Sequence, residues 1–153
     1  MRTPEDADIR IENVQCRGIV LKDDQILLMF RRKKGREYYV LPGGHMEKGE
    51  KPIDTVIREV KEETTVEVSN FELAFEFKNH KDKDIEKLEY YFVGKWKSGE
   101  PTLSGEESRE TDESNYYEPI WVSLTDVPRL KLYSGAVKEW IVNSLNKYLK
   151  ERD

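Results

Sequence analysis

The sequence predicts a fold of the α/β (α+β) class, in which a mixed β-sheet lies between helices. Segments rich in β-branched and aromatic residues occur on both sides of a helical stretch near the middle of the chain. Two segments show the three-to-four-residue apolar spacing of amphipathic helices. Strands grouped with two helices predict a sheet covered on both sides. Since 153 residues is near the usual domain size, we expect a single domain over 1–153 with a flexible tail at 1–8.

The first part of the chain predicts three strands. Residues 9–21 and 25–32 are rich in β-formers and are joined by the turn 22–24, so they are expected to form a hairpin. A short strand at 38–41 runs into the Pro-Gly-Gly sequence at 42–44. The two glycines allow backbone conformations that side chains would block, so this loop can bring carbonyl groups to a metal ion.

The second part predicts three more strands and a loop. Residues 66–78 and 88–96 alternate or are rich in aromatic residues, and the polar stretch 80–86 between them indicates a long antiparallel pair. Residues 98–115 contain glycine, proline and many acids, which predicts a long loop. The short apolar segment 119–123 follows as a strand.

The final segment predicts an amphipathic helix with Ser134 as its N-cap. Its apolar positions are Val137, Trp140, Ile141, Leu145, Tyr148 and Leu149.

The central helix is expected to begin near Lys51. Pro52 suits the first helical position, and Asp54 adds a favourable negative charge to the first turn. The apolar stripe of this helix has the spacing i, i+3, i+4, i+7 and consists of Ile53, Val56, Ile57 and Val60.

Three carboxylates form a second patch on the same helix. Glu59, Glu62 and Glu63 have the spacing i, i+3, i+4, which places them within about 100° of one another around the helix axis. Each like-charge pair costs a few tenths of a kcal/mol. A bound Mg²⁺ or Mn²⁺ would convert this repulsion into coordination by hard oxygen ligands. The spacing therefore predicts a metal site, whereas a glutamate-rich face taken alone is usually only solvated surface.

The pattern extends beyond the helix. It consists of Gly44, five residues, Glu50, seven residues, Arg58-Glu59, an aliphatic residue, a spacer, Glu62-Glu63, two spacers and Val66. This 23-residue segment resembles the box of the Nudix hydrolases at every named position but one. The exception is Thr65, where the family usually has glycine just past the helix. Positive φ is often needed there, so we expect either strain or a different helix end.

The resemblance implies the Nudix fold and cleavage of the diphosphate linkage in a nucleoside diphosphate joined to another group. It implies Glu59, Glu62 and Glu63 as ligands of Mg²⁺, for which Mn²⁺ can substitute, with the Gly43 carbonyl as a further ligand. It also implies a supporting ion pair of Glu50 and Arg58. Glu59 is our first choice for the general base. The second choice is one of four glutamates in the predicted loop 98–115. For each of them, a place in an exposed acidic loop without a catalytic role is an equally good explanation: Glu106, Glu107, Glu110 and Glu113.

A basic cluster precedes the glycine turn and offers charge-assisted donors to a polyphosphate, although a solvated loop would explain most of its members: Arg31, Arg32, Lys33, Lys34 and Arg36. The residues that we select as substrate candidates are Arg31, Arg32, Arg36, Gly44, Glu107 and Glu110. Six aromatic residues are candidates for stacking on a base, and about half should point into the core instead: Tyr90, Tyr91, Phe92, Tyr116, Tyr117 and Trp121.

The substrate prediction rests on segments outside the box. Some family members that act on dinucleoside polyphosphates or ADP-ribose carry Tyr or Pro where this chain has residues 82–84, Asp-Lys-Asp. The segment 115–122 resembles the post-loop strand of members that clean the nucleotide pool. We therefore predict a nucleoside triphosphate or modified dNTP. The alternatives are a non-catalytic nucleotide sensor and a hydrolase of ADP-ribose, nucleotide sugars, dinucleoside polyphosphates or RNA 5′ ends.

Composition restricts location and partners. The single cysteine, Cys16, excludes an internal disulfide and is expected to be a small buried apolar residue. No apolar run approaches 18 residues and no signal-peptide core is present, so we expect a cytoplasmic protein without a membrane partner. The net charge of −5 disfavours nucleic acid as a partner. The aromatic content leaves room for a homodimer interface.

Overall fold

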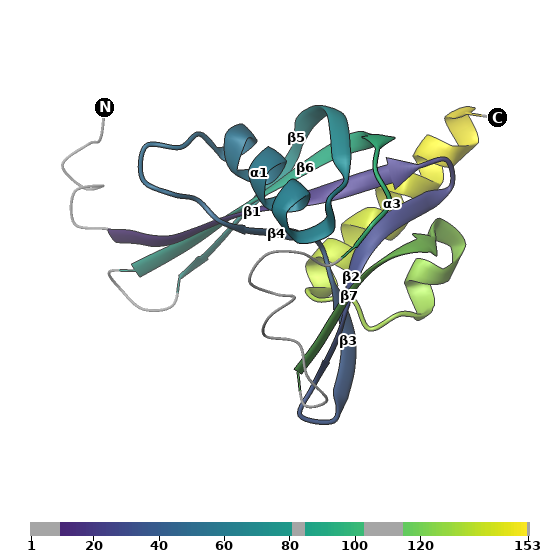
Figure 1. Cartoon of the computed structure of the whole chain (residues 1–153), viewed down its shortest axis with the longest axis horizontal. Helices are drawn as coiled ribbons and strands as arrows, with labels where there is room; N and C mark the ends of the chain where they lie inside the picture. Colours follow the sequence, from purple (N-terminus) through teal and green to yellow (C-terminus); the bar gives the residue numbers. More distant parts are fainter. Residues whose placement is uncertain (1–9, 81–84, 103–114, 153) are drawn as a thin grey trace.

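The computed structural model describes residues 10–80, 85–102 and 115–152 (Figure 1). Its strands are β1 (Arg10–Lys22), β2 (Gln25–Lys33), β3 (Arg36–Val40), β4 (Gly43–His45), β5 (Glu67–His80), β6 (Ile85–Ser98) and β7 (Asn115–Ser123). Its helices are α1 (Pro52–Thr64), the 3₁₀ helix η2 (Leu124–Arg129) and α3 (Gly135–Arg152).

All seven strands belong to one mixed sheet, as predicted. The main path is β3-β2-β1-β6-β5, with β4 paired to β1 and β7 paired to β2. The pairing of β1 with β6 is parallel, and the other pairings are antiparallel. The predicted hairpin of β1 and β2 is present, but its pairing stops after Leu21 with Ile26 and Lys22 with Gln25. Beyond these two pairs each strand continues with different neighbours.

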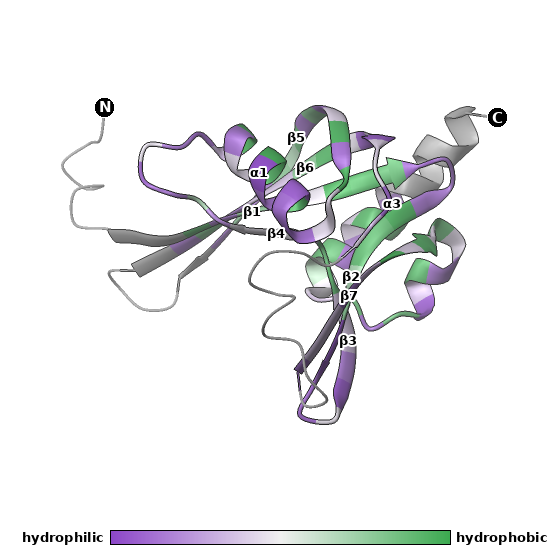
Figure 2. Cartoon of the chain, in the orientation of Figure 1, coloured by the Kyte–Doolittle hydropathy of each residue, from purple (hydrophilic) through white to green (hydrophobic). Residues whose placement is uncertain are grey.

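The sheet carries an apolar core on each face. Alternation along β1 sends Ile19 and Leu21 to the face covered by η2 and α3, and sends Val20 to the face covered by α1. In Figure 1, α1 lies in front of the sheet and α3 lies behind it. Figure 2 shows hydrophobic colours along the middle of the sheet and hydrophilic colours at the β2–β3 turn and in the loop before α1. The two covered faces confirm the predicted arrangement.

The helix α1 begins where the sequence predicts, with Lys51 as its N-cap and proline in its first turn. Of the predicted apolar stripe, Val56 and Val60 are fully buried, whereas Ile57 is about half exposed at 49%. The predicted strain at the other end is present, because Thr65 has a left-handed backbone with φ of 64°.

The strained Thr65 is held by contacts on both sides. Its N–H donates to the Lys61 carbonyl at 2.9 Å, and its hydroxyl donates to the Glu100 carbonyl at 2.8 Å. The helix therefore ends at the usual position of the family pattern without glycine, and the threonine hydroxyl ties this end to the segment after β6.

Several features of the fold differ from the sequence prediction, including the earlier starts of β3 at Arg36 and of β6 at Ile85. The glycine turn forms a strand of its own, β4, because its backbone pairs with β1. Strand β7 begins at Asn115 instead of residue 119, because its first residues pair with Arg31, Arg32 and Lys33 of β2. The 3₁₀ helix η2 was not predicted. Each difference depends on tertiary pairing or packing, which local composition does not encode.

The structure bears on the expected absence of a membrane-spanning segment and on the place of the single cysteine. Within the described ranges, the structure contains no helix with the length and apolar character needed to span a bilayer. Cys16 is fully buried, as predicted, and burial raises the pKa of its thiol to about 11.

The buried face of β2 should dominate stability. Leu28 is fully buried under η2 and α3, whereas Leu73 on β5 is 50% exposed. We expect Leu28→Ala to lower the free energy of unfolding by about 2–5 kcal/mol, because it leaves a cavity in a packed core. The matched change Leu73→Ala should cost less than about 1 kcal/mol. Urea denaturation of both variants checks this, and equal losses would contradict the assignment of the core.

Candidate active site

The glycine loop lies directly against β1 and α1. Gly43 pairs with Arg17 and Gly44 pairs with Cys16 in the register of β4 and β1. A Cβ on Gly43 would lie 2.1 Å from the Cys16 carbonyl oxygen, and Gly43 has a positive φ of 153°. A Cβ on Gly44 would lie 2.5 Å from the Glu59 carboxylate. Only glycine allows this approach of strand, loop and helix.

Two glutamates of α1 reach this loop. The Gly43 N–H donates to Glu63 Oε2 at 2.9 Å, so one carboxylate is bonded to the loop backbone. Glu59 Oε1 accepts a hydrogen bond from Arg58 Nη1 at 2.8 Å, and its carboxylate lies against Gly44. Both glutamates, one turn apart on α1, line the same cavity.

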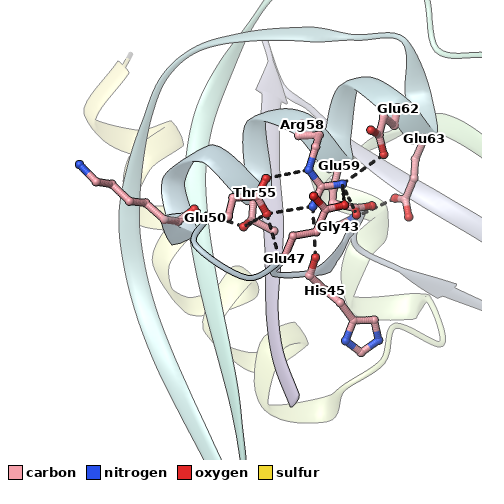
Figure 3. Close-up of polar contacts among 10 residues, drawn as sticks. Gly43, His45, Glu47, Glu50, Thr55, Arg58, Glu59, Glu62 and Glu63 are labelled. Carbon is pink, nitrogen blue, oxygen red and sulfur yellow. Dashed lines mark hydrogen bonds and ion pairs between the residues drawn. The ribbon is translucent and has the colours of Figure 1, made fainter. Parts of the chain in front are cut away.

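Arg58 forms a two-point ion pair with Glu50, as Figure 3 shows. Its Nε lies 2.8 Å from Glu50 Oε2, and its Nη2 lies 3.0 Å from Glu50 Oε1. The ion pair that the resemblance implies is therefore present. The paired side chains are mostly shielded from solvent, with exposures of 24% for Arg58 and 15% for Glu50. Such a fork geometry is among the stronger charge-assisted contacts.

Arg58 also contacts groups outside this pair. Its Nη1 lies 3.3 Å from Glu62 Oε2 and 3.8 Å from Glu47 Oε1. Its Nη2 donates to the His45 carbonyl at 3.2 Å. Figure 3 shows the guanidinium in the middle of these oxygens and the His45 ring turned away from it. One cation therefore joins the helix to the loop that precedes it.

Glu50 is held in its ionised form. Hydrogen bonds from Arg58, the Thr55 hydroxyl and the Glu47 N–H lower the pKa of its carboxyl group to about 2. The same contacts act in reverse on Arg58, since the bond to Glu50 raises the pKa of the guanidinium. The loop between β4 and α1 is therefore closed by an ion pair that stays charged across the neutral range.

The cavity beside the glycine loop has a volume of about 470 Å³. One side is formed by the loop and by Glu47, Glu59 and Glu63. Other parts of its lining come from Gln15 and Arg17 of β1, Arg31 of β2 and Tyr117 of β7. The cavity therefore has carboxylates from the helix and loop, and guanidinium groups from two strands that diverge from their common hairpin.

Comparison with known proteins assigns the chain to a family. The family model described as the NUDIX domain matches residues 13–141. The chain belongs to the Nudix family. It is 30% identical over 118 residues to the uncharacterized Nudix hydrolase YvcI of Bacillus subtilis, covering 76% of this chain and 70% of YvcI.

Two further Nudix-related proteins extend the comparison. YjhB of Bacillus subtilis, whose name suggests an ADP-ribose pyrophosphatase, is 34% identical over 76 residues, which is 50% of this chain but only 36% of YjhB. The structure of a mutator MutT protein from Bacillus halodurans is 30% identical, with a TM-score of 0.60 and coverage of 87% of this chain and 81% of that protein. Family membership makes the chain a pyrophosphohydrolase, and enzymes of the Nudix family generally use divalent metal ions.

The Nudix box supplies the right donor type for such an ion. Carboxylate and carbonyl oxygens are the ligands that Mg²⁺ prefers, and Glu59, Glu63 and the Gly43 backbone share one cavity. Within the described part of the chain, no three His, Cys, Asp or Glu side chains are gathered as they would be around a metal ion. Instead, Arg58 lies between Glu50, Glu59 and Glu62. The donor set fits a divalent cation, although the present side-chain arrangement is that of an ion-pair network.

The predicted substrate residues are placed in three groups. Arg31 and Gly44 line the cavity. Arg32 and Arg36 are not among the residues that line the cavity. Arg32 Nε lies 3.7 Å from Glu37 Oε1, and Arg36 Nη2 donates to the Tyr133 hydroxyl at 3.1 Å. Glu107 and Glu110 lie outside the described residues, as do Glu106 and Glu113.

The sequence prediction did not include several residues that line the cavity, among them Gln15 and Arg17. A signal was present, because Arg17 is a charged residue in an otherwise apolar segment from Cys16 to Leu21. Of the six aromatic candidates for base stacking, only Tyr117 is among the residues that line the cavity. Trp121, for example, is partly buried and packs against the core cluster under α1.

The Glu50 contacts generate a prediction for acid stability. Because the pKa of Glu50 falls from 4.5 to about 2 on folding, its stabilising effect is complete above about pH 4.5 and is lost as the pH falls towards 2. We expect Glu50→Gln to lower the melting temperature at pH 7, and the gap to the wild type to narrow steadily below pH 4.5. Thermal unfolding from pH 7 to pH 3 measures this, with the exposed Glu72→Gln as control. A gap that does not change with pH would refute the assignment.

Proposed function

We propose that this Nudix hydrolase is a metal-dependent pyrophosphohydrolase that cleaves a nucleoside triphosphate or a modified dNTP. The observation that supports this is the cavity of about 470 Å³, in which Glu59 and Glu63 are combined with Arg31 and Tyr117. Its volume lies in the range of small-ligand sites. Carboxylates for a metal, a guanidinium for phosphate and an aromatic ring for a base are the groups that a nucleotide requires.

In this proposal Glu59, Glu62, Glu63 and the Gly43 carbonyl would hold Mg²⁺, with Mn²⁺ as a substitute. When bound, such an ion supplies positive charge to the phosphate oxygens and makes a water molecule more acidic. The ion pair of Arg58 with Glu50 holds α1 against the preceding loop and thereby positions the ligands. Arg58 would release Glu59 and Glu62 to the cation while it keeps its two bonds to Glu50.

The remaining steps belong to side chains of the cavity. Glu59 is the proposed general base, which takes a proton from the attacking water. The Arg31 guanidinium donates hydrogen bonds to phosphate, and it is already oriented by the Tyr117 hydroxyl, to which its Nη2 donates. The centre of the Tyr117 ring lies 4.2 Å from the Arg31 guanidinium carbon. We propose that this ring stacks on the nucleobase of the substrate.

Two observations support the choice of substrate. The chain is similar to a protein named as a mutator MutT protein, and its segment 115–122, which forms most of β7, resembles the corresponding strand of pool-cleaning members. A second candidate substrate is ADP-ribose, because the chain is also 34% identical over 76 residues to YjhB, whose name suggests an ADP-ribose pyrophosphatase. The proposal includes a cytoplasmic location, which the single cysteine supports since disulfides are rare in that compartment.

The proposed chemistry predicts a loss of activity without a loss of fold. We expect Glu63→Gln to lower kcat at least about 100-fold, because it removes a ligand charge from the reaction centre. Wild-type turnover should disappear with excess EDTA and return with Mg²⁺. The measurement is phosphate and pyrophosphate release from (d)NTPs, modified dNTPs, ADP-ribose, nucleotide sugars, dinucleoside polyphosphates and capped RNA, with Glu139→Gln on α3 as control.

The outcomes of this panel differ in meaning. Preferred cleavage of a triphosphate supports the proposal. Preferred cleavage of ADP-ribose would show that ADP-ribose, and not a triphosphate, is the substrate. If no substrate is cleaved but nucleotides still raise the melting temperature, the chain is a nucleotide sensor and the proposal fails.

The close approach at Gly44 predicts a second effect on activity. A Cβ there would lie 2.5 Å from the Glu59 carboxylate, which is the end of a flexible side chain. We therefore expect Gly44→Ala to fold with nearly the wild-type melting temperature but to lose about 100-fold in kcat/KM, because Glu59 must move. Gly135→Ala, where an added Cβ meets no atom within 4 Å, is the control. Unchanged kcat/KM in Gly44→Ala would exclude Glu59 from the reaction.

A further inference from the structure

Two guanidinium groups in the cavity have no carboxylate partner among the residues that the structure describes. Arg17 Nη1 donates to the Leu41 carbonyl and Nη2 donates to Gln15 Oε1, both at 2.9 Å. Arg31 Nη2 donates to the Tyr117 hydroxyl. Within the described ranges, neither arginine has a carboxylate oxygen within 4 Å. Arg58, in contrast, has carboxylate oxygens of four glutamates within that distance. Partly buried cations held only by neutral acceptors favour the binding of an anion.

A second observation concerns Arg31. Its Nε atom is buried and has no hydrogen-bond partner among the described residues. Buried N–H groups are rarely left unpaired, and each exception calls for an explanation such as a ligand. The guanidinium is also placed firmly, since its central carbon lies 4.2 Å from the centre of the Tyr117 ring and 5.5 Å from that of Tyr38.

Arg17 is fixed close to the Nudix box. In the register of β1 and β4 it pairs with Gly43, whose N–H holds the Glu63 carboxylate. Arg17 therefore lies one strand away from the anchor of a proposed metal ligand. Its bonds to Leu41 and Gln15 fix the guanidinium in one orientation, so less conformational freedom would be lost when it binds a ligand.

From these contacts we infer that Arg17 is a specificity-determining residue. Together with Arg31 it binds a further phosphate of the substrate, in addition to the phosphate that the metal ion at the box carboxylates would contact. The inference rests on the proposed function and narrows it. A nucleoside triphosphate offers a further anionic phosphate to this pair, whereas a nucleotide sugar offers an uncharged group. The chain should therefore prefer substrates with at least three phosphates in a row.

Kinetics of Arg17 variants test the inference. We expect Arg17→Gln to raise KM for a nucleoside triphosphate about 10- to 100-fold, the range for loss of a charge-assisted hydrogen bond. KM for a nucleotide sugar should change less than about 3-fold, because no anion is lost. Arg17→Lys keeps the charge but not the forked geometry of the guanidinium, so its KM for the triphosphate should lie between those of the wild type and Arg17→Gln. Arg129→Gln, an exposed arginine paired with Asp126, controls for net charge.

A structural role of Arg17 would give a different result. If the residue only supports the strand through its bond to Leu41, the variant should lower kcat and raise KM equally for both substrates, and Arg17→Lys should give no selective recovery. Equal effects on the triphosphate and the sugar would overturn the inference.

Binding without turnover separates this inference from the proposed function. Inorganic tripolyphosphate in the presence of EDTA should raise the melting temperature of the wild type and of Arg129→Gln, but not of Arg17→Gln. This result can stand even if no substrate is hydrolysed, in which case only the proposed function fails. Absence of any shift that depends on Arg17 overturns the inference, even if the enzyme hydrolyses triphosphates.

Discussion

The absence of side chains at two glycines is the constraint on which the site depends. A Cβ at Gly43 would overlap the Cys16 carbonyl, and a Cβ at Gly44 would overlap the Glu59 carboxylate. The first clash is with backbone, which cannot move without breaking the pairing of β1 with β4. The second is with a side-chain end, which can move at the cost of its position. One glycine therefore allows the strands to pair, and the next leaves room for the carboxylate of Glu59, the proposed general base.

The charged groups of the site lie in one partly buried ion pair and along one open cavity. Glu50 and Arg58 form a shielded pair in which each group stabilises the charged form of the other. Because this pair joins the loop to the helix, it holds the helix backbone in place whether or not Glu59 and Glu62 also contact Arg58. In the proposed mechanism, Glu59 and Glu62 would exchange their contacts with Arg58 for a cation without loosening the segment that carries them.

The parts of the structure that depend on local spacing could be predicted from the sequence. The start of α1, its carboxylate patch and the strained Thr65 all follow from residues within one 23-residue segment. The placement of Arg17 could not be predicted this way, because it depends on pairing with Gly43, 26 residues away. The same holds for Tyr117, which meets Arg31 through the register of β2 with β7. Local periodicity contains no information on which distant strands become neighbours.

This difference explains why a Nudix box identifies a reaction but leaves the substrate open. The box is contiguous, so its chemistry is readable from one segment. The opposite wall of the cavity is built where β1 and β2 separate after only two paired positions, which brings Arg17 and Arg31 from different strands to one space. Arg17 and Arg31 line the cavity but are not part of the box, so they can change while the residues of the box stay the same. Substrate preference can therefore vary among proteins that keep the same catalytic segment.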